Sequence, residues 1–117
     1  YFEELYLKAL KVRRLVADEL SAALDKYRLL LSPTMPTPPP RLGEKTTDPL
    51  SMYMMDVETI PASLAGLPAL SIPVGTVDGL PVGLQVLGRR MDEPSLLALS
   101  ARFEDEVMKG PAPLASL

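Results

Sequence analysis

The chain has 117 residues, 47% of them hydrophobic, a length and composition suited to one packed unit or to part of a larger domain. Twelve basic and 15 acidic residues give a formal net charge of −3, which excludes a broadly basic surface for gripping a phosphate backbone. Cysteine and histidine are absent, so these residues hold no disulfide, no thiolate or histidine metal site and no Ser-His-Asp triad.

A long amphipathic helix is predicted over residues 2–26. Apolar side chains recur there at steps of three and four residues, and neither proline nor glycine interrupts them. The opening residues Tyr1 to Glu4 lack the pattern of a signal peptide, and no apolar run approaches the ~20 residues that a bilayer requires. We therefore expect a cytoplasmic protein without a membrane span. Because the opening resembles the interior of a helix, we also expect the chain to be a segment of a longer protein.

A short strand and a proline-rich loop follow. The apolar run Arg28 to Ser32, bounded by Pro33, predicts a buried strand of a parallel or mixed sheet. Residues 33–41 contain five prolines, and because each one removes a backbone donor, we expect an extended, polyproline-like loop. Within it, Pro36 to Arg41 fits the spacing Pro-x-x-Pro-x-Arg of SH3 ligands. That spacing leaves open the hypothesis of a non-enzymatic interaction module.

Two short helices are predicted next. Asp48 suits an N-cap and Pro49 suits the first helical position, so a turn or short helix should cover Leu50 to Met55. A second helix should run from Glu58 to Ala65 and end at Gly66, since glycine readily adopts the left-handed conformation that terminates helices.

A β-hairpin is predicted in the second half of the chain. Strands are expected at 70–74 and 82–88, because the Asp-Gly pair at 78–79 between them is a strong reversal signal. Pro73 indicates an edge strand or a bulge. Gly83, inside a strand, is the expected place for a ligand or a neighbouring segment to approach the backbone closely.

The last predicted element is a helix from about Glu93 to Met108, which Gly110 and Pro111 stop. Residues 106–117 are expected to be a mobile tail. The order of helix, strand, long loop, short helices, hairpin and helix predicts an α/β fold in which a sheet is flanked by helices.

Several motifs carry a resemblance to a known family. They are Lys11 to Arg13, Ser32 to Thr37, Asp48 to Gly75 and Asp78 to Gly88. Together they resemble the C-terminal block of amidase-signature enzymes. The stretch Gly43 to Lys45, followed by Asp48 to Tyr53 and Asp56, is similar to the A subunits of tRNA-dependent amidotransferases. The resemblance covers residues 1 to about 106. It implies that residues 1–117 are the C-terminal segment of an amidase domain, built on a mixed β-sheet flanked by helices.

The resemblance also implies roles for residues. The family uses a Ser nucleophile, a bridging Ser with a cis peptide and a Lys, all in a region that precedes Tyr1, so no catalytic residue is expected in this chain. Asp56 matches the aspartate that holds the α-ammonium of a glutamine donor through charge-assisted hydrogen bonds. The arginine for the α-carboxylate falls just upstream of residue 1.

For the whole protein, the resemblance implies release of ammonia from glutamine and its transfer to a partner subunit, which amidates Glu-tRNA(Gln) or Asp-tRNA(Asn). ATP, Mg²⁺ and tRNA would then belong to the complex of subunits, and no cofactor or metal is expected on this segment. A plain amidase acting on small amides is the alternative within enzymes.

Three groups of residues also have simpler interpretations. Asp56 precedes a helical run and suits an N-cap, a role compatible with substrate binding. Met52, Met54 and Met55 are more typical of irregular core packing than of a soft-metal site. Arg89 and Arg90 are more typical of a solvated strand end than of a contact to tRNA phosphate.

Overall fold

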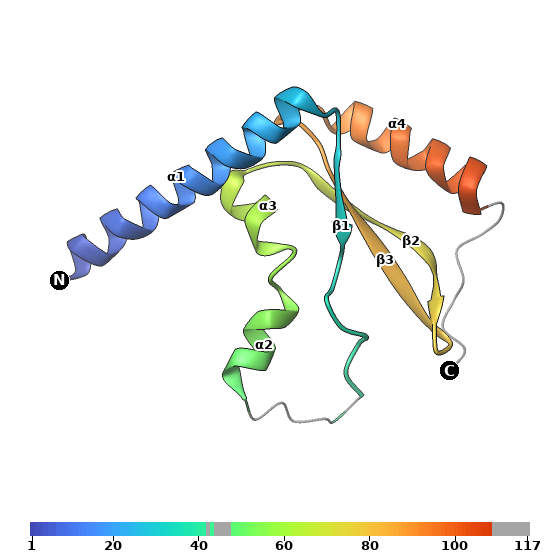
Figure 1. Cartoon of the computed structure of the whole chain (residues 1–117), viewed down its shortest axis with the longest axis horizontal. Helices are drawn as coiled ribbons and strands as arrows, with labels where there is room; N and C mark the ends of the chain where they lie inside the picture. The colour runs from blue at the N-terminus through green and yellow to red at the C-terminus, as the bar shows by residue number, and fades with distance from the viewer. Residues whose placement is uncertain (42, 44–47, 109–117) are drawn as a thin grey trace.

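The computed structural model describes residues 1–41, 43 and 48–108, in which helices flank a three-stranded sheet (Figure 1). The elements in chain order are α1 (Phe2–Lys26), β1 (Leu30–Pro33), α2 (Pro49–Met55), α3 (Ile60–Ala65), β2 (Ala69–Val77), β3 (Leu80–Leu87), α4 (Glu93–Phe103) and the helical turn η1 (Glu104–Met108). This arrangement matches the α/β class predicted from the sequence.

The described strands pair in the order β1-β3-β2, and both pairings are antiparallel. The central row of the sheet places Ser32 of β1 opposite Gln85 of β3, and Gln85 opposite Ser71 of β2. The short strand expected before the proline-rich loop is present as β1, but the expectation that it is buried is wrong for the described chain, because its residues are half-buried or exposed and Leu31 is 62% exposed. Its described neighbour, β3, runs antiparallel to it.

The predicted hairpin is formed by β2 and β3. Asp78 and Gly79 turn the chain with φ angles of 52° and 78°, the positive values that a tight two-residue turn requires. The register shifts between Pro73 and Gly75, so Val74 is an extra residue and forms the β-bulge that the sequence indicated. β2 is an edge strand of the described sheet, where the missing donor of proline is tolerated.

One face of the sheet packs against α4. Ile72, Val86 and Leu96 form the buried centre of this core, and each is at most 6% exposed. The partly buried side chains around them are Leu29, Leu70, Val74, Leu84 and Phe103. Because successive side chains of a strand point to opposite faces, Gln85 faces away from α4 when Val86 faces toward it. The polar groups described below therefore lie on the other face of the sheet.

The short helices begin and end close to the predicted residues. The carboxylate of Asp48 caps α2 by accepting hydrogen bonds from the backbone amides of Leu50 and Ser51, both at 3.2 Å, and from the Ser51 hydroxyl at 2.7 Å. α3 begins at Ile60, two residues later than predicted. It ends at Gly66, whose φ of 66° and ψ of 40° are left-handed.

Arginine side chains join the helices to the end of β3. Arg89 Nε donates to the carbonyl of Leu24 near the end of α1, and Arg90 Nη2 donates to the carbonyl of Ala65 at the end of α3, both at 2.9 Å. Cationic donors satisfy the unpaired carbonyls at a helix C-terminus and oppose the helix dipole. Both arginines are exposed just after the end of β3, as expected for a solvated strand end, and their side chains in addition cap the two helices.

The last helix continues through η1 to Met108, so Glu106 to Met108 of the expected tail 106–117 belong to a helical turn. The rest of that tail, 109–117, lies outside the described residues. In the part of the chain that the structure describes, no helix combines the length and the hydropathy needed to cross a membrane.

Candidate functional site

Asp56, the residue expected to contact substrate, lies at the junction between α2 and α3. Its backbone amide donates to the carbonyl of Tyr53 at 3.2 Å, and its own carbonyl accepts from the amides of Thr59 and Ile60, each at 3.0 Å. Its side chain is exposed, and within residues 1–41, 43 and 48–108 no hydrogen bond or ion pair engages its carboxylate. The interpretation of Asp56 as an N-cap is wrong, because it is the C-cap of α2 and the N-cap of α3 is Thr59.

A polar row crosses the sheet on the face opposite α4. Its centre is Gln85, which is 5% exposed and whose Nε2 donates to the backbone carbonyl of Glu58 at 2.7 Å and to Ser32 Oγ at 3.0 Å. Because a carbonyl only accepts, the contact with Glu58 fixes which end of the amide carries the hydrogens. Gln85 therefore ties the central strand to β1 and to the junction that carries Asp56.

Gln85 was not among the residues predicted from the sequence to belong to the site. One signal was available, because Gln85 is the only strongly polar residue in the run Val82 to Leu87, and a polar group inside a buried strand requires a hydrogen-bond partner. Its partner Glu58 lies 27 residues earlier, and no local pattern connects the two positions.

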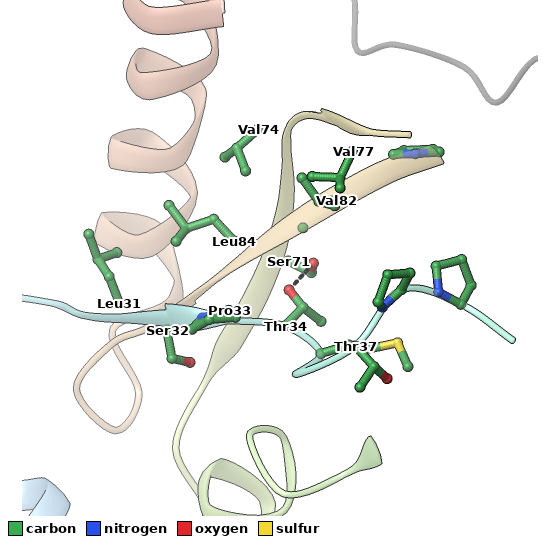
Figure 2. A pocket seen from close by; sticks show the side chains of 15 residues that line it. Leu31, Ser32, Pro33, Thr34, Thr37, Ser71, Val74, Val77, Val82 and Leu84 are labelled. Carbon is green, nitrogen blue, oxygen red and sulfur yellow. Dashed lines mark hydrogen bonds between the residues drawn. The ribbon is translucent and has the colours of Figure 1, made fainter. Parts of the chain in front are cut away.

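Beside this row, the hydroxyls of Thr34 and Ser71 meet at 2.6 Å (Figure 2). The backbone amide of Thr34 donates to the carbonyl of Gly83 at 3.1 Å, which extends the pairing one residue beyond β1. A Cβ at position 83 would lie 2.6 Å from Ser71 Oγ and 2.8 Å from Thr34 Oγ1. The close approach predicted at Gly83 is confirmed, and the groups that approach it are these two hydroxyls.

The hydroxyl pair lines a pocket of about 620 Å³ between the hairpin and the proline-rich segment (Figure 2). Its polar side chains are Ser32, Thr34, Thr37 and Ser71, and most of the remaining wall is valine, leucine and proline. None of the lining residues in the described chain has an ionisable side chain. This pocket therefore offers shape and hydrogen bonds to a bound group but no side chain that would act as an acid or a base.

A second pocket of about 550 Å³ lies between the prolines at 36–40 and α2. Asp48, Ser51, Met54 and Met55 contribute to its wall, and Asp56 lines neither of these two pockets. The Ser51 hydroxyl, followed by the backbone amides of Leu50 and Ser51, holds the pKa of the Asp48 carboxyl below its ordinary value of 3.8. Asp48 is thus a charged helix cap at the edge of this pocket.

A serine that is activated through a lysine needs both side chains close together. Among the described residues, no lysine lines the first pocket. The lysines of the described chain are Lys8, Lys11 and Lys26, all on α1, whereas the pocket serines are Ser32 and Ser71. Among the described residues, no group of three His, Cys, Asp or Glu side chains gathers where a metal ion could be held.

The fold and these motifs define a class of protein: the chain belongs to the amidase family. A sequence profile described as Amidase matches residues 1–97, a span that includes Asp56, the hairpin and both pockets. The resemblance noted from the sequence motifs is confirmed.

Within that class, the chain is similar to the A subunit of glutamyl-tRNA(Gln) amidotransferase. It is 52% identical over 104 residues to the protein of that name from Methanosarcina acetivorans. The aligned residues make up 89% of this chain and 22% of the relative. The crystal structure of the Thermotoga maritima protein of the same name matches with a TM-score of 0.88 and 41% identity, over 100% of this chain and 27% of that one. A crystal structure described as an amidase matches with a TM-score of 0.79 and 34% identity, over 90% and 25% of the two chains.

These structural matches confirm the predicted fold class, because the sheet and its helices superpose on part of the amidase fold. The chain spans about a fifth of the length of the curated relatives that it matches.

Proposed function

We propose that the whole protein containing this chain is the amide-hydrolysing subunit of a tRNA-dependent amidotransferase. It releases ammonia from glutamine and passes it to a partner subunit, which converts Glu-tRNA(Gln) or Asp-tRNA(Asn) to the amidated form. The observation that carries the proposal is the 52% identity over 104 residues to the A subunit of a glutamyl-tRNA(Gln) amidotransferase. In this proposal ATP, Mg²⁺ and tRNA are bound by the complex of subunits, in the cytoplasm.

Asp56 is assigned to the α-ammonium group of glutamine. Two observations support this role: the carboxylate is exposed, and hydrogen bonds from Thr59 and Ile60 hold the backbone carbonyl of the same residue. A carboxylate and an ammonium group form charge-assisted hydrogen bonds, which are roughly twice as strong as neutral ones. The serine nucleophile and its lysine are assigned to the part of the protein outside this chain, so the segment alone is expected to be inactive.

The test is Asp56→Asn in the whole protein assembled with its partner subunits, with glutamate release as the assay. Loss of a hydrogen bond to a charged group is worth about 1.5–3 kcal/mol, so the KM for glutamine should rise roughly 10- to 150-fold, with a smaller change in kcat. Asp78→Asn is the matched control, because Asp78 is exposed in the hairpin turn and asparagine tolerates its positive φ. An unchanged KM for glutamine would remove the assignment of Asp56.

A plain amidase acting on small amides is the second candidate, favoured by the 34% identity to a solved amidase. Copurification with two other subunits and glutamine-dependent amidation of Glu-tRNA(Gln) support the amidotransferase. Hydrolysis of small amides without partners, and without amidation of tRNA, supports the plain amidase.

The interaction-module hypothesis rests on the spacing of Pro36 to Arg41 alone. Pro38 and Pro39, at the centre of that spacing, are exposed and line the two pockets described above. A pulldown with SH3 domains, using Pro39→Ala as the control, is the measurement that would revive this hypothesis.

A further inference from the structure

We propose that Gln85 is a positioning residue for Asp56. Its side-chain amide holds the backbone carbonyl of Glu58 at 2.7 Å, and this contact sets the orientation in which the Asp56 carboxylate meets the ammonium group of the substrate. The inference rests on the proposed role of Asp56 and adds to it the group that fixes its geometry.

The connection between the two residues is short. Glu58 follows Asp56 by two residues, and because an extended chain spans at most about 3.6 Å per residue, the Glu58 carbonyl stays close to Asp56. A shift of that carbonyl is therefore expected to move Asp56. On the other side, the Asp56 carbonyl is held by the first amides of α3. The junction between α2 and α3 is thus fixed at two points, one on α3 and one on the sheet.

The anchor on the sheet is rigid. Gln85 belongs to β3, the central strand, which is hydrogen-bonded to β1 on one side and to β2 on the other. The same Nε2 also donates to Ser32 Oγ at 3.0 Å, so the amide plane is held by two acceptors. A group that must contact substrate needs a supporting residue whose own conformation is locked, and Gln85 meets that requirement.

Burial makes this contact costly to lose. Gln85 is 5% exposed and Glu58 is half-buried. In such surroundings a hydrogen bond is stronger than in water, and an acceptor deprived of its donor retains the penalty of its desolvation. Without the amide, the Glu58 carbonyl is expected to turn toward water, and the turn carrying Asp56 is expected to move with it.

The experiment compares two substrates in the whole enzyme with its partner subunits. One is glutamine and the other is glutaramate, which is glutamine without the α-ammonium group. Gln85→Met keeps the length of the side chain and removes its donors. We expect kcat/KM for glutamine to fall roughly tenfold, the effect of losing about one hydrogen bond, while the value for glutaramate stays within about twofold.

Val86→Ala is the control for lost stability, because Val86 is the next residue on β3 and packs under α4, away from Glu58. It should lower the melting temperature. The substrate ratio, meaning kcat/KM for glutamine divided by kcat/KM for glutaramate, should stay unchanged. Should Gln85→Met fail to assemble, Gln85→Asn takes its place, since it keeps the amide on a chain one methylene shorter. Equal losses with both substrates in a folded Gln85 variant would overturn the inference.

Asp56→Asn, alone and combined with Gln85→Met, separates this inference from the proposed function. If Gln85 acts through Asp56, the second substitution should not change the substrate ratio further in the Asp56→Asn protein. If Asp56→Asn lowers the ratio and Gln85→Met does not, only the inference fails. If Asp56→Asn leaves the ratio unchanged, the proposed role of Asp56 fails, and the role of Gln85 fails with it.

Discussion

The hydroxyls of Thr34 and Ser71 meet at 2.6 Å at the one position of β3 that has no side chain, Gly83. One hydroxyl donates to the other, so the second proton of the pair remains available to a group in the adjoining pocket. The end of β1 and the middle of β2 thereby meet across the central strand. The φ angle of Gly83 is not in the left-handed region, so its backbone conformation does not require glycine. Glycine is required here because a Cβ would collide with the two hydroxyls.

Gly83→Ala should destabilise the protein by about 1–3 kcal/mol, the usual cost of adding a methyl group where no space exists. The new Cβ would lie 2.6 Å from Ser71 Oγ, so either the hydroxyl pair or the strand must shift. Thermal unfolding of the whole protein measures this effect. Adding Ser71→Ala should recover part of the loss, because it removes the nearest clashing atom, and purely additive losses would argue against the contact.

Ser100→Ala should stabilise the protein by about 1 kcal/mol. Ser100 is 4% exposed on α4, and among the described residues its Oγ has no hydrogen-bond partner. Alanine removes this buried hydroxyl and also favours the helix. Ser21→Ala, at an exposed position of α1, gives the gain from helix propensity alone. A lower melting temperature for Ser100→Ala would show that the hydroxyl does have a partner in the whole protein.

The elements predicted from sequence are those whose ends are set by local backbone chemistry. Asp48 next to a proline caps a helix, Gly66 ends one, and the Asp-Gly pair at 78–79 reverses the chain, each through contacts within a few residues. The long-range contacts were not predicted. Arg89 reaches a carbonyl 65 residues earlier in the chain, and a charged pair at a strand end gives no local sign of such a partner.

The candidate site likewise has features that the sequence predicts and features that it does not. The close approach at Gly83 could be predicted, because glycine weakens a strand and is found inside one mainly where the strand bends or another group comes near its backbone. The exposure of Asp56 and the support from Gln85 could not, because both depend on how the α2–α3 junction packs against the sheet. The N-cap expected for Asp56 failed for a local reason, since the helix begins at Ile60 and Thr59 occupies the cap position.

Acid should loosen the start of α2. The Ser51 hydroxyl and the amides of Leu50 and Ser51 hold the pKa of Asp48 below its ordinary value of 3.8. A carboxyl with a lowered pKa stabilises the folded state fully above that ordinary value, and the contribution is lost as the pH falls through the lower folded value. Hydrogen exchange of the backbone amides of residues 50–55 should therefore accelerate below about pH 4.

Asp48→Asn is the control for this pH dependence. Asparagine keeps an oxygen that caps the helix but does not titrate, so exchange in α2 should become independent of pH in that range once intrinsic rates are subtracted. Asp48→Ala should show fast exchange at every pH. If the wild type and Asp48→Asn responded equally to acid, another group would control this helix.

The 117-residue chain expressed alone should self-associate. Leu5, Leu7 and Leu15 of α1 are 55%, 55% and 63% exposed, and each leucine that an interface buries fully contributes about 1.5–3 kcal/mol. The exposed side chains of α2 add to this surface: Leu50, Met52, Tyr53 and Met54. Apolar area of this extent on separate helices is typical of a surface that another part of the protein, or another copy, covers.

Light scattering at rising concentration should show oligomers, and combining Leu5→Glu with Leu15→Glu should shift them toward the monomer. A wild-type chain that stays monomeric at high concentration would instead identify the segment as a self-sufficient unit whose apolar helices tolerate water.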